Sequence, residues 1–204
     1  MQIKSRKKLF VYGGLILLLL LIVSAIEIVT YLQYERYKTE PVTVDSILRS
    51  VFWDAGEYRV SEVRDDESFQ IGFRKEWIPA DTEHPIEIGK PIKTVGDTTL
   101  LLDVAYRTQF PDGEEVTLMV QLENDTKKLR GQFLLDGYIG QTEVLQPQLE
   151  LSFYHQNEPI EAASYGYGTG GNITVSLPLD MLEKYQYQID VVVKGLVLYE
   201  YECE

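Results

Sequence analysis

The first apolar pattern is an uninterrupted hydrophobic run near the N-terminus. Residues 9–26 read LFVYGGLILLLLLIVSAI and contain no charged side chain. At about 1.5 Å rise per residue, a helix extended to residue 30 nearly matches a hydrocarbon core of about 30 Å. We therefore predict a transmembrane helix over residues 9–30.

The flanks of this run predict its orientation. A basic cluster lies within residues 1–8, whereas the acidic residues Glu27 and Glu35 follow the run. Because cytoplasmic flanks of membrane helices are rich in Lys and Arg, residues 1–8 are expected in the cytoplasm and the C-terminal domain outside. The alternative is a cleaved signal peptide, since Val23 and Ala25 have the spacing of a cleavage site, although the apolar run is longer than usual for one.

After the membrane segment, apolar residues recur with the helical period of 3.6 residues. The helix is expected to continue into a stalk over residues 31–43, which Pro41 breaks. An amphipathic stripe then consists of Val44, Ile47, Leu48, Val51 and Phe52. This spacing predicts a short helix packed on the sheet or, alternatively, docked on a partner helix in the membrane.

Beyond residue 57 the period changes from 3.6 to 2. Apolar side chains alternate with polar or small ones within residues 69–73, 100–106, 116–122, 149–153, 173–179 and 187–193. Turn-forming residues separate these runs at 65–66, 111–113, 124–125 and 170–172. Short alternating strands without long helices between them predict a mainly β domain, an antiparallel sandwich or barrel.

One segment narrows the expected architecture. Residues 179–189, LDMLEKYQYQI, combine a short turn with a strand that carries Tyr185 and Tyr187 near its start. This segment resembles the tyrosine corner of immunoglobulin-like and fibronectin-like sandwiches, with either tyrosine as the corner residue. The resemblance implies an immunoglobulin-like β-sandwich and implies nothing about function.

Residues 78–97 interrupt the alternation. The stretch IPADTEHPIEIGKPIKTVGD contains three prolines and two glycines and is interpreted as an irregular connection. The predicted organisation is therefore a helix plus β-hairpin extension over 44–97 and a β-sandwich over 98–204.

Charge narrows the class of partner. The chain has a net charge of −13, and the residues after 38 carry −17, from thirteen basic and thirty acidic side chains. This excess repels phosphate backbones, so we expect no nucleic-acid binding, whereas a cationic partner is compatible with it. Simple solubility is the other explanation of the acidity.

Cysteine content bears on the compartment. Cys203 is the single cysteine, so an intramolecular disulfide cannot form. Because small animal ectodomains are usually disulfide-stapled, this composition favours a bacterial cell-envelope protein.

Residues 166–171 formally match the GxGxxG dinucleotide fingerprint. That motif requires a strand before it and a helix after it, whereas the pattern here continues into a strand, so we expect no nucleotide cofactor. A loop is the better interpretation, and its Tyr165 and Tyr167 are a candidate contact surface.

No other constellation indicates chemistry. His84 and His155 lack partners at zinc-ligand spacing, and no nucleophile lies beside a histidine in the sequence. Residues 65–67 are the densest acidic cluster but lack the spacing of a calcium loop, so a solvated turn is expected. We therefore predict no metal, no cofactor and no catalytic residue.

These observations predict a non-enzymatic, single-pass membrane protein whose outer domain acts as an interaction or assembly module with a protein partner in the envelope. The first alternative is a carbohydrate- or ligand-binding sensor domain. The second is an envelope enzyme with a carboxylate-based site assembled from distant residues.

Overall fold

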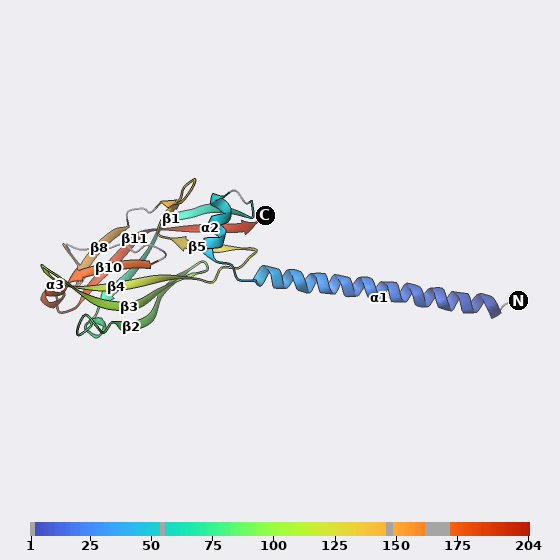
Figure 1. The fold of residues 1–204 in the computed structure, drawn as a ribbon, viewed down its shortest axis with the longest axis horizontal. Coiled ribbons are helices and arrows are strands. Elements are labelled where there is room, and N and C mark those ends of the chain that lie inside the picture. Colours follow the sequence, from blue (N-terminus) through green and yellow to red (C-terminus); the bar gives the residue numbers. More distant parts are fainter. Residues whose placement is uncertain (1–2, 54–55, 146–148, 162–171) are drawn as a thin grey trace. The chain divides into compact units, whose positions relative to one another are not determined.

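The computed structural model describes residues 3–53, 56–145, 149–161 and 172–204, with side chains from Leu18 onward (Figure 1). The chain divides into two compact units. The first comprises Met1–Glu40 and Lys127–Leu129, and the second comprises Pro41–Thr126 and Arg130–Glu204.

The first unit is dominated by one long helix, α1 (Ile3–Thr39). Its part Leu18–Thr39 is long and apolar enough to cross a membrane, a property that signal sequences share. The expected span 9–30 and most of the expected stalk belong to this single helix, because the helical pattern continues through polar residues as far as Thr39.

The second unit begins with α2 (Val44–Phe52), as the amphipathic stripe predicts. Thr43 caps the helix, and its Oγ1 accepts a hydrogen bond from the Ser46 N–H at 3.2 Å. Ile47 is fully buried against the sheet. The buried Ser50 hydroxyl accepts the N–H groups of Glu57 and Tyr58, which joins the helix to the first strand.

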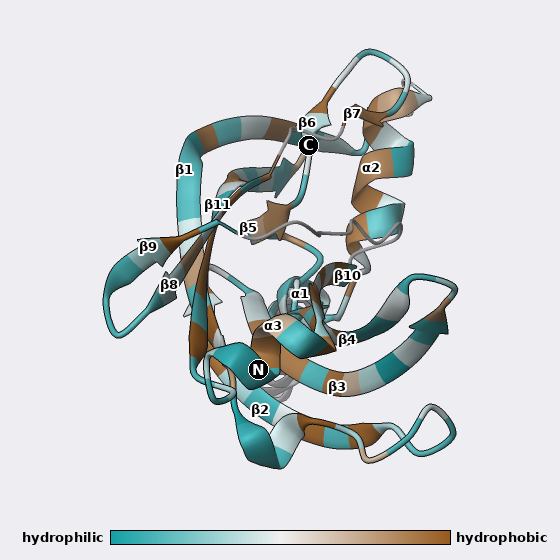
Figure 2. Cartoon of the chain, turned by 90° about the vertical axis from the view of Figure 1, so that its left-hand side faces the viewer, coloured by the Kyte–Doolittle hydropathy of each residue, from teal (hydrophilic) through white to brown (hydrophobic). Residues whose placement is uncertain are grey.

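Two large antiparallel sheets form most of the rest of this unit (Figure 2). The first has the order β1-β11-β8-β9, and β5 also pairs with β11: β1 (Tyr58–Phe73), β5 (Arg130–Leu135), β8 (Glu150–His155), β9 (Glu158–Ile160) and β11 (Ile189–Cys203). The second has the order β10-β4-β3-β2: β2 (Ile86–Val95), β3 (Thr98–Phe110), β4 (Gly113–Asn124) and β10 (Asn172–Pro178). Shorter elements are η1 (Lys75–Trp77), the hairpin of β6 (Tyr138–Ile139) and β7 (Val144–Leu145), and α3 (Leu179–Lys184).

The main core lies between the two sheets. Its buried side chains come from both, for example Phe73 and Val191 from one sheet and Leu118 and Val175 from the other. This core confirms a mainly β domain with antiparallel sheets. Residues 44–97 contribute β1 and β2 to the same sheets, and side chains of both strands join residues 98–204 in this core.

A second core covers the opposite face of the first sheet. Ile47 of α2 packs there with Phe133 of β5 and with Val197, Tyr199 and Tyr201 of β11. Residues 196–199 of β11 are therefore buried on both faces. Because such a strand does not alternate between apolar and polar residues, the periodicity of the sequence missed it.

Two expectations for the strands were wrong. The segment 78–97 contains β2, an edge strand that pairs with β3 through register shifts beside Gly89 and Pro91. An edge strand tolerates a proline that a central strand does not. Asp65 and Asp66 lie inside β1 at register irregularities instead of in a turn between two strands.

The start of the last strand also differs from the prediction. Gln186 and Tyr187 have positive φ angles of 54° and 57°, so β11 begins at Ile189. The Tyr187 hydroxyl lies 3.5 Å from the side-chain Oε1 of Glu183, whereas the tyrosine corner uses a backbone acceptor.

Candidate functional site

Tyr165 and Tyr167, together with the glycine-rich match at 166–171, lie outside the described residues. Their role as a contact surface stays a prediction.

The acidic cluster at 65–67 forms an ion-pair network on β1. Glu67 is buried, and its two carboxylate oxygens pair with Arg64 and with Lys93 Nζ, the latter at 2.7 Å. Asp65 accepts a hydrogen bond from the Tyr138 hydroxyl at 3.1 Å. The ion pair between Glu67 and Lys93 links β1 to β2. Because cations already pair with both carboxylate oxygens of Glu67, this side chain is not available as a metal ligand. Among the described residues, no group of three potential ligands is placed to hold a metal ion.

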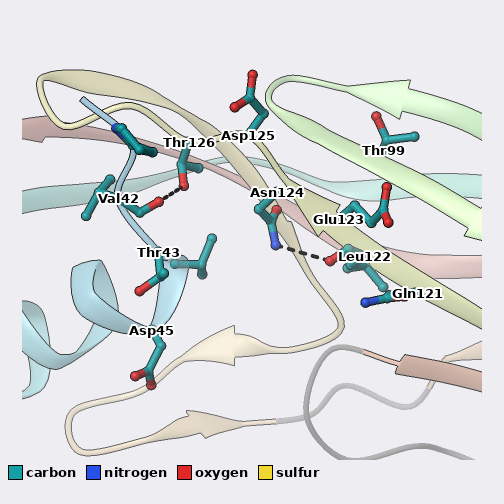
Figure 3. A pocket seen from close by; sticks show the side chains of 12 residues that line it. Val42, Thr43, Asp45, Thr99, Gln121, Leu122, Glu123, Asn124, Asp125 and Thr126 are labelled. Atoms are coloured by element: carbon teal, nitrogen blue, oxygen red, sulfur yellow. Dashed lines mark hydrogen bonds between the residues drawn. The ribbon is translucent and has the colours of Figure 1, made fainter. Parts of the chain in front are cut away.

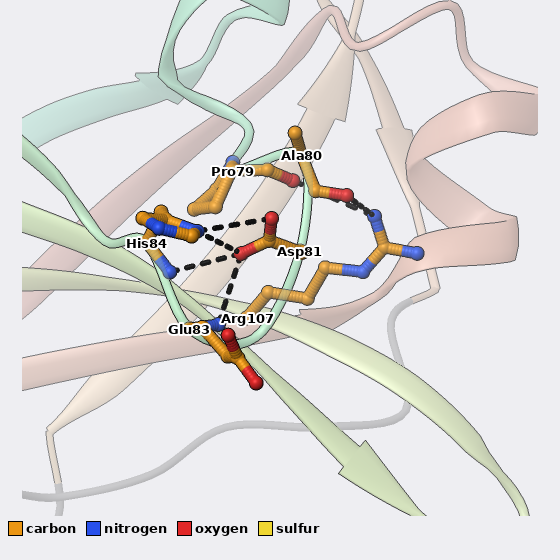
Figure 4. A network of polar contacts seen from close by, with 6 residues as sticks. All are labelled: Pro79, Ala80, Asp81, Glu83, His84 and Arg107. Atoms are coloured by element: carbon orange, nitrogen blue, oxygen red, sulfur yellow. Dashed lines mark hydrogen bonds and ion pairs between the residues drawn. The ribbon is translucent and has the colours of Figure 1, made fainter.

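His84 belongs to an exposed turn (Figure 4). Asp81 Oδ1 accepts the backbone N–H groups of Glu83 and His84, both at 2.9 Å, and lies 2.9 Å from His84 Nδ1. The hydrogen bond with His84, followed by those from the backbone, lowers the pKa of Asp81. Arg107 contacts the same turn by donating to the Ala80 carbonyl at 3.1 Å, and it also pairs with Glu114 of β4.

His155 also has a structural role. Its Nδ1 lies 2.9 Å from the Gln188 carbonyl oxygen, and its ring packs 5.1 Å from that of Tyr185. These contacts fasten the turn that leads into β11. Cys203 lies in the same strand opposite Tyr58.

The strongest candidate site is a groove of about 860 Å³ beside the N-terminus of α2 (Figure 3). Its twelve lining residues are Pro41, Val42, Thr43, Val44, Asp45, Thr99 and the run from Gln121 to Thr126. One wall is therefore the segment that leads into α2, and the other is the end of β4 with the start of β3.

Thr126 fixes the first wall. Its carbonyl accepts the Val42 N–H at 3.1 Å, and its hydroxyl donates to the Val42 carbonyl at 2.5 Å. Both backbone polar groups of Val42 are thereby satisfied by one buried residue. The wall is held in place by backbone geometry instead of by long, mobile side chains.

A buried polar junction supports the second wall. The fully buried Thr98 hydroxyl donates to Asn124 Oδ1 at 2.5 Å and accepts the Leu134 N–H at 2.9 Å. Nearby, Asp97 accepts the Gln132 N–H through its carboxylate and the Asp125 N–H through its carbonyl. These bonds join the end of β4 to β5 and fix the backbone that forms the groove.

The groove is acidic. Asp45, Glu123 and Asp125 line it, and none of the twelve described lining residues is basic. Figure 3 shows these carboxylates at three separate places around the groove. Asp45 also pairs with Arg49 at 2.9 Å on the exposed side of α2. Separated carboxylates cannot converge on a single ion, but they match a partner that carries several spaced cations.

The sequence did not reveal this site. The sequence predicts a turn at Asn124 and Asp125, and Asp45 lies within the predicted helix. Neither pattern indicates that residues about eighty positions apart in the chain form one groove. The only signal was a group of Asn, Asp and Thr residues at the end of a predicted strand.

No family model, curated protein or solved structure matches the chain. The function is therefore inferred from the residues themselves.

Proposed function

We propose that this chain is a membrane-anchored interaction module whose β domain holds a cationic segment of a protein partner. The observation that carries the proposal is the groove, which is preformed, about 860 Å³ in volume, and lined by three carboxylates without a basic residue among the described lining. Such a surface attracts Lys- and Arg-bearing segments over a distance and orients them before contact.

The N-terminal helix supports the membrane part of the proposal. A helix that can span a bilayer restricts the domain to the membrane surface, where partners are encountered at high local concentration. With the basic cluster of residues 1–8 on the cytoplasmic side, the β domain faces the cell envelope.

An immunoglobulin-like relationship belongs to this proposal as well. Two antiparallel sheets around one core support it. The pairing of the first strand β1 with the last strand β11 differs from the ABED and CFG order of that family.

The test uses the full chain in detergent micelles and a fluorescent lysine-rich peptide. The variant Asp45→Asn/Glu123→Gln/Asp125→Asn is expected to bind the peptide at least tenfold more weakly, because it removes every charge from the groove lining. A glutamate-rich peptide is expected not to bind either form.

The matched control is Glu83→Gln/Glu158→Gln/Glu161→Gln, which changes the net charge equally at exposed positions away from the groove. If this control weakens binding as much as the groove variant does, the attraction belongs to the acidic surface in general and the groove is not the site.

The two alternative functions stay predictions. A carbohydrate- or ligand-binding sensor acting through Tyr165 and Tyr167 predicts that Tyr165→Ala/Tyr167→Ala abolishes glycan binding. An envelope enzyme predicts turnover that a single carboxylate substitution removes.

A further inference from the structure

A second pocket, of about 380 Å³, opens between the C-terminal end of β1 and the middle of β2. Its apolar lining consists of Ile71, Pro91, Ile92 and Leu102, with the indole of Trp77 from η1. Its polar lining consists of Gln70, Arg74, Lys90 and Asp190. An apolar pocket with a few convergent polar groups is the usual form of a small-molecule site, and this volume lies within their range.

Arg74 is held in one position in this pocket. Its Nη2 pairs with Asp190 Oδ1 at 2.6 Å, and its Nη1 donates to the Phe73 carbonyl at 2.9 Å. Gly72 makes this possible, because a Cβ at that position would overlap the guanidinium group. The arginine is therefore preorganised, and the conformational cost of ordering it does not oppose ligand binding.

Lys90 supplies a second cation. Its Nζ lies 5.3 Å from the centroid of the Trp77 ring. Gly89, with φ +59°, produces the bulge of β2 that precedes this lysine. Within the described part of the chain, Lys90 forms no ion pair, whereas Arg74 is paired with Asp190.

The pocket is consequently positive in an acidic domain. Its lining carries two cations and one carboxylate, whereas the residues after 38 carry a net charge of −17. A local excess of this sign selects an anion, and Lys90 is the cation available to it.

We propose that this pocket binds a saccharide that carries a carboxylate, namely a uronic acid residue. The carboxylate pairs with Lys90 and lies beside the Arg74 guanidinium. The apolar face of the sugar ring packs against Trp77, because indoles combine large contact area with little conformational freedom. Gln70 supplies a hydrogen-bond donor and Asp190 supplies an acceptor for the hydroxyl groups of the sugar. This proposal does not depend on the acidic groove.

Neutral sugars fit the pocket less well. A neutral ligand covers Lys90 without supplying a counter-charge, and a cation deprived of water without a partner is unfavourable. A simple carboxylate such as acetate supplies the charge but leaves the Trp77 wall and the hydroxyl partners unused. Recognition therefore requires the charge and the ring together.

The experiment follows the fluorescence of Trp77 in full-length Trp53→Phe protein, in a detergent without a sugar head group. Trp53 is 74% exposed, so its replacement leaves the core intact. Glucuronate is expected to change the emission saturably, and glucose and acetate are each expected to bind at least tenfold more weakly. Lys90→Gln is expected to reduce glucuronate affinity at least tenfold.

Lys75→Gln is the matched control, because Lys75 lies on η1 outside the pocket lining. Its glucuronate affinity is expected to be unchanged. Equal binding of glucose and glucuronate, no response to glucuronate, or equal losses in Lys90→Gln and Lys75→Gln each overturn the proposal. The groove variant Asp45→Asn/Glu123→Gln/Asp125→Asn is expected to retain this response, because the two sites share no lining residue, so the two proposals are tested independently.

Discussion

At the scale of single residues, Asp136 has a side chain whose ionised form is disfavoured in the folded protein. It lies in the turn after β5, and burial raises its pKa above the usual value of 3.8. A folded-state pKa above the unfolded one means that the native protein binds the proton more tightly. Stability is therefore lost as the pH rises through the folded pKa, and the ionised carboxylate destabilises the protein at neutral pH.

We accordingly expect Asp136→Asn to raise the melting temperature at pH 7, because the amide carries no charge to desolvate. The gain is expected to disappear as the pH falls below about 3.8, where the wild-type carboxyl group is itself neutral. Thermal unfolding monitored by circular dichroism at pH 7 and pH 3 measures both values.

Asp81 provides the control with the opposite sign. Its pKa is lowered by the hydrogen bond with His84 and by backbone donors, so its contribution is present above the usual carboxyl pKa and is lost on acidification. Asp81→Asn is therefore expected to lower the melting temperature at pH 7 and to lower it less at pH 3. A stabilising effect of both substitutions at pH 7 would contradict the assignment of these two environments.

At the scale of elements, Gly195 determines how β11 serves two cores. Before it, Val191 and Val193 face the core between the sheets, and after it Leu196 and Leu198 do so. The inward-facing positions thus change from odd to even residue numbers at Gly195. This change coincides with a register shift against β1 and with a φ of 94° at Gly195. One extra residue thus turns Val197 toward α2.

Gly195→Ala is expected to destabilise the protein by about 1–3 kcal/mol, because an L-residue with a side chain rarely adopts this φ. Lys194→Ala is the control, since it removes an exposed side chain from the neighbouring position without strain. Denaturant unfolding of the full chain in micelles measures the two free energies, and equal values for the two variants would show that the bulge is not strained.

The strands show what periodicity can and cannot predict. The runs around 100–106, 116–122 and 173–179 became β3, β4 and β10, because each has one face in the core and alternates accordingly. Periodicity failed for β2, where Gly89 and Pro91 interrupt the pattern at an edge, and for residues 196–199 of β11, which are apolar and buried on both faces.

Pairing between distant segments was beyond the reach of local patterns. Nothing in the sequence indicates that Tyr58 lies opposite Cys203, and the same limit applies to both candidate sites. The groove joins Asp45 to Asp125, and the second pocket joins Arg74 to Asp190. The residue types were visible in the sequence, but their convergence depends on the topology of the two sheets.

At the scale of the whole molecule, the proposed function depends on where the β domain is located. The described helix Leu18–Thr39 satisfies the length and composition of a membrane span and equally those of a signal sequence. The two possibilities differ in the location of the β domain. Cleavage releases the domain from the membrane, whereas an uncleaved helix keeps it membrane-bound.

We expect the full-length chain to remain in the membrane fraction after extraction at alkaline pH. In whole cells stripped of outer layers, protease is expected to digest the β domain from outside if the basic residues 1–8 lie in the cytoplasm, as we propose. Leu19→Arg/Leu20→Arg is expected to release the chain from the membrane, since two charges at the bilayer centre cost about 5–7 kcal/mol on insertion scales.

The control is Lys38→Gln, which changes one charge at the end of the helix and is expected to leave the membrane fraction unaltered. N-terminal sequencing of the mature protein separates the two possibilities. A chain that begins at Met1 supports the anchor, whereas one that begins at Ile26 would show cleavage after Ala25. A released domain would still carry the acidic groove, but it would meet its cationic partner in solution instead of at a membrane surface.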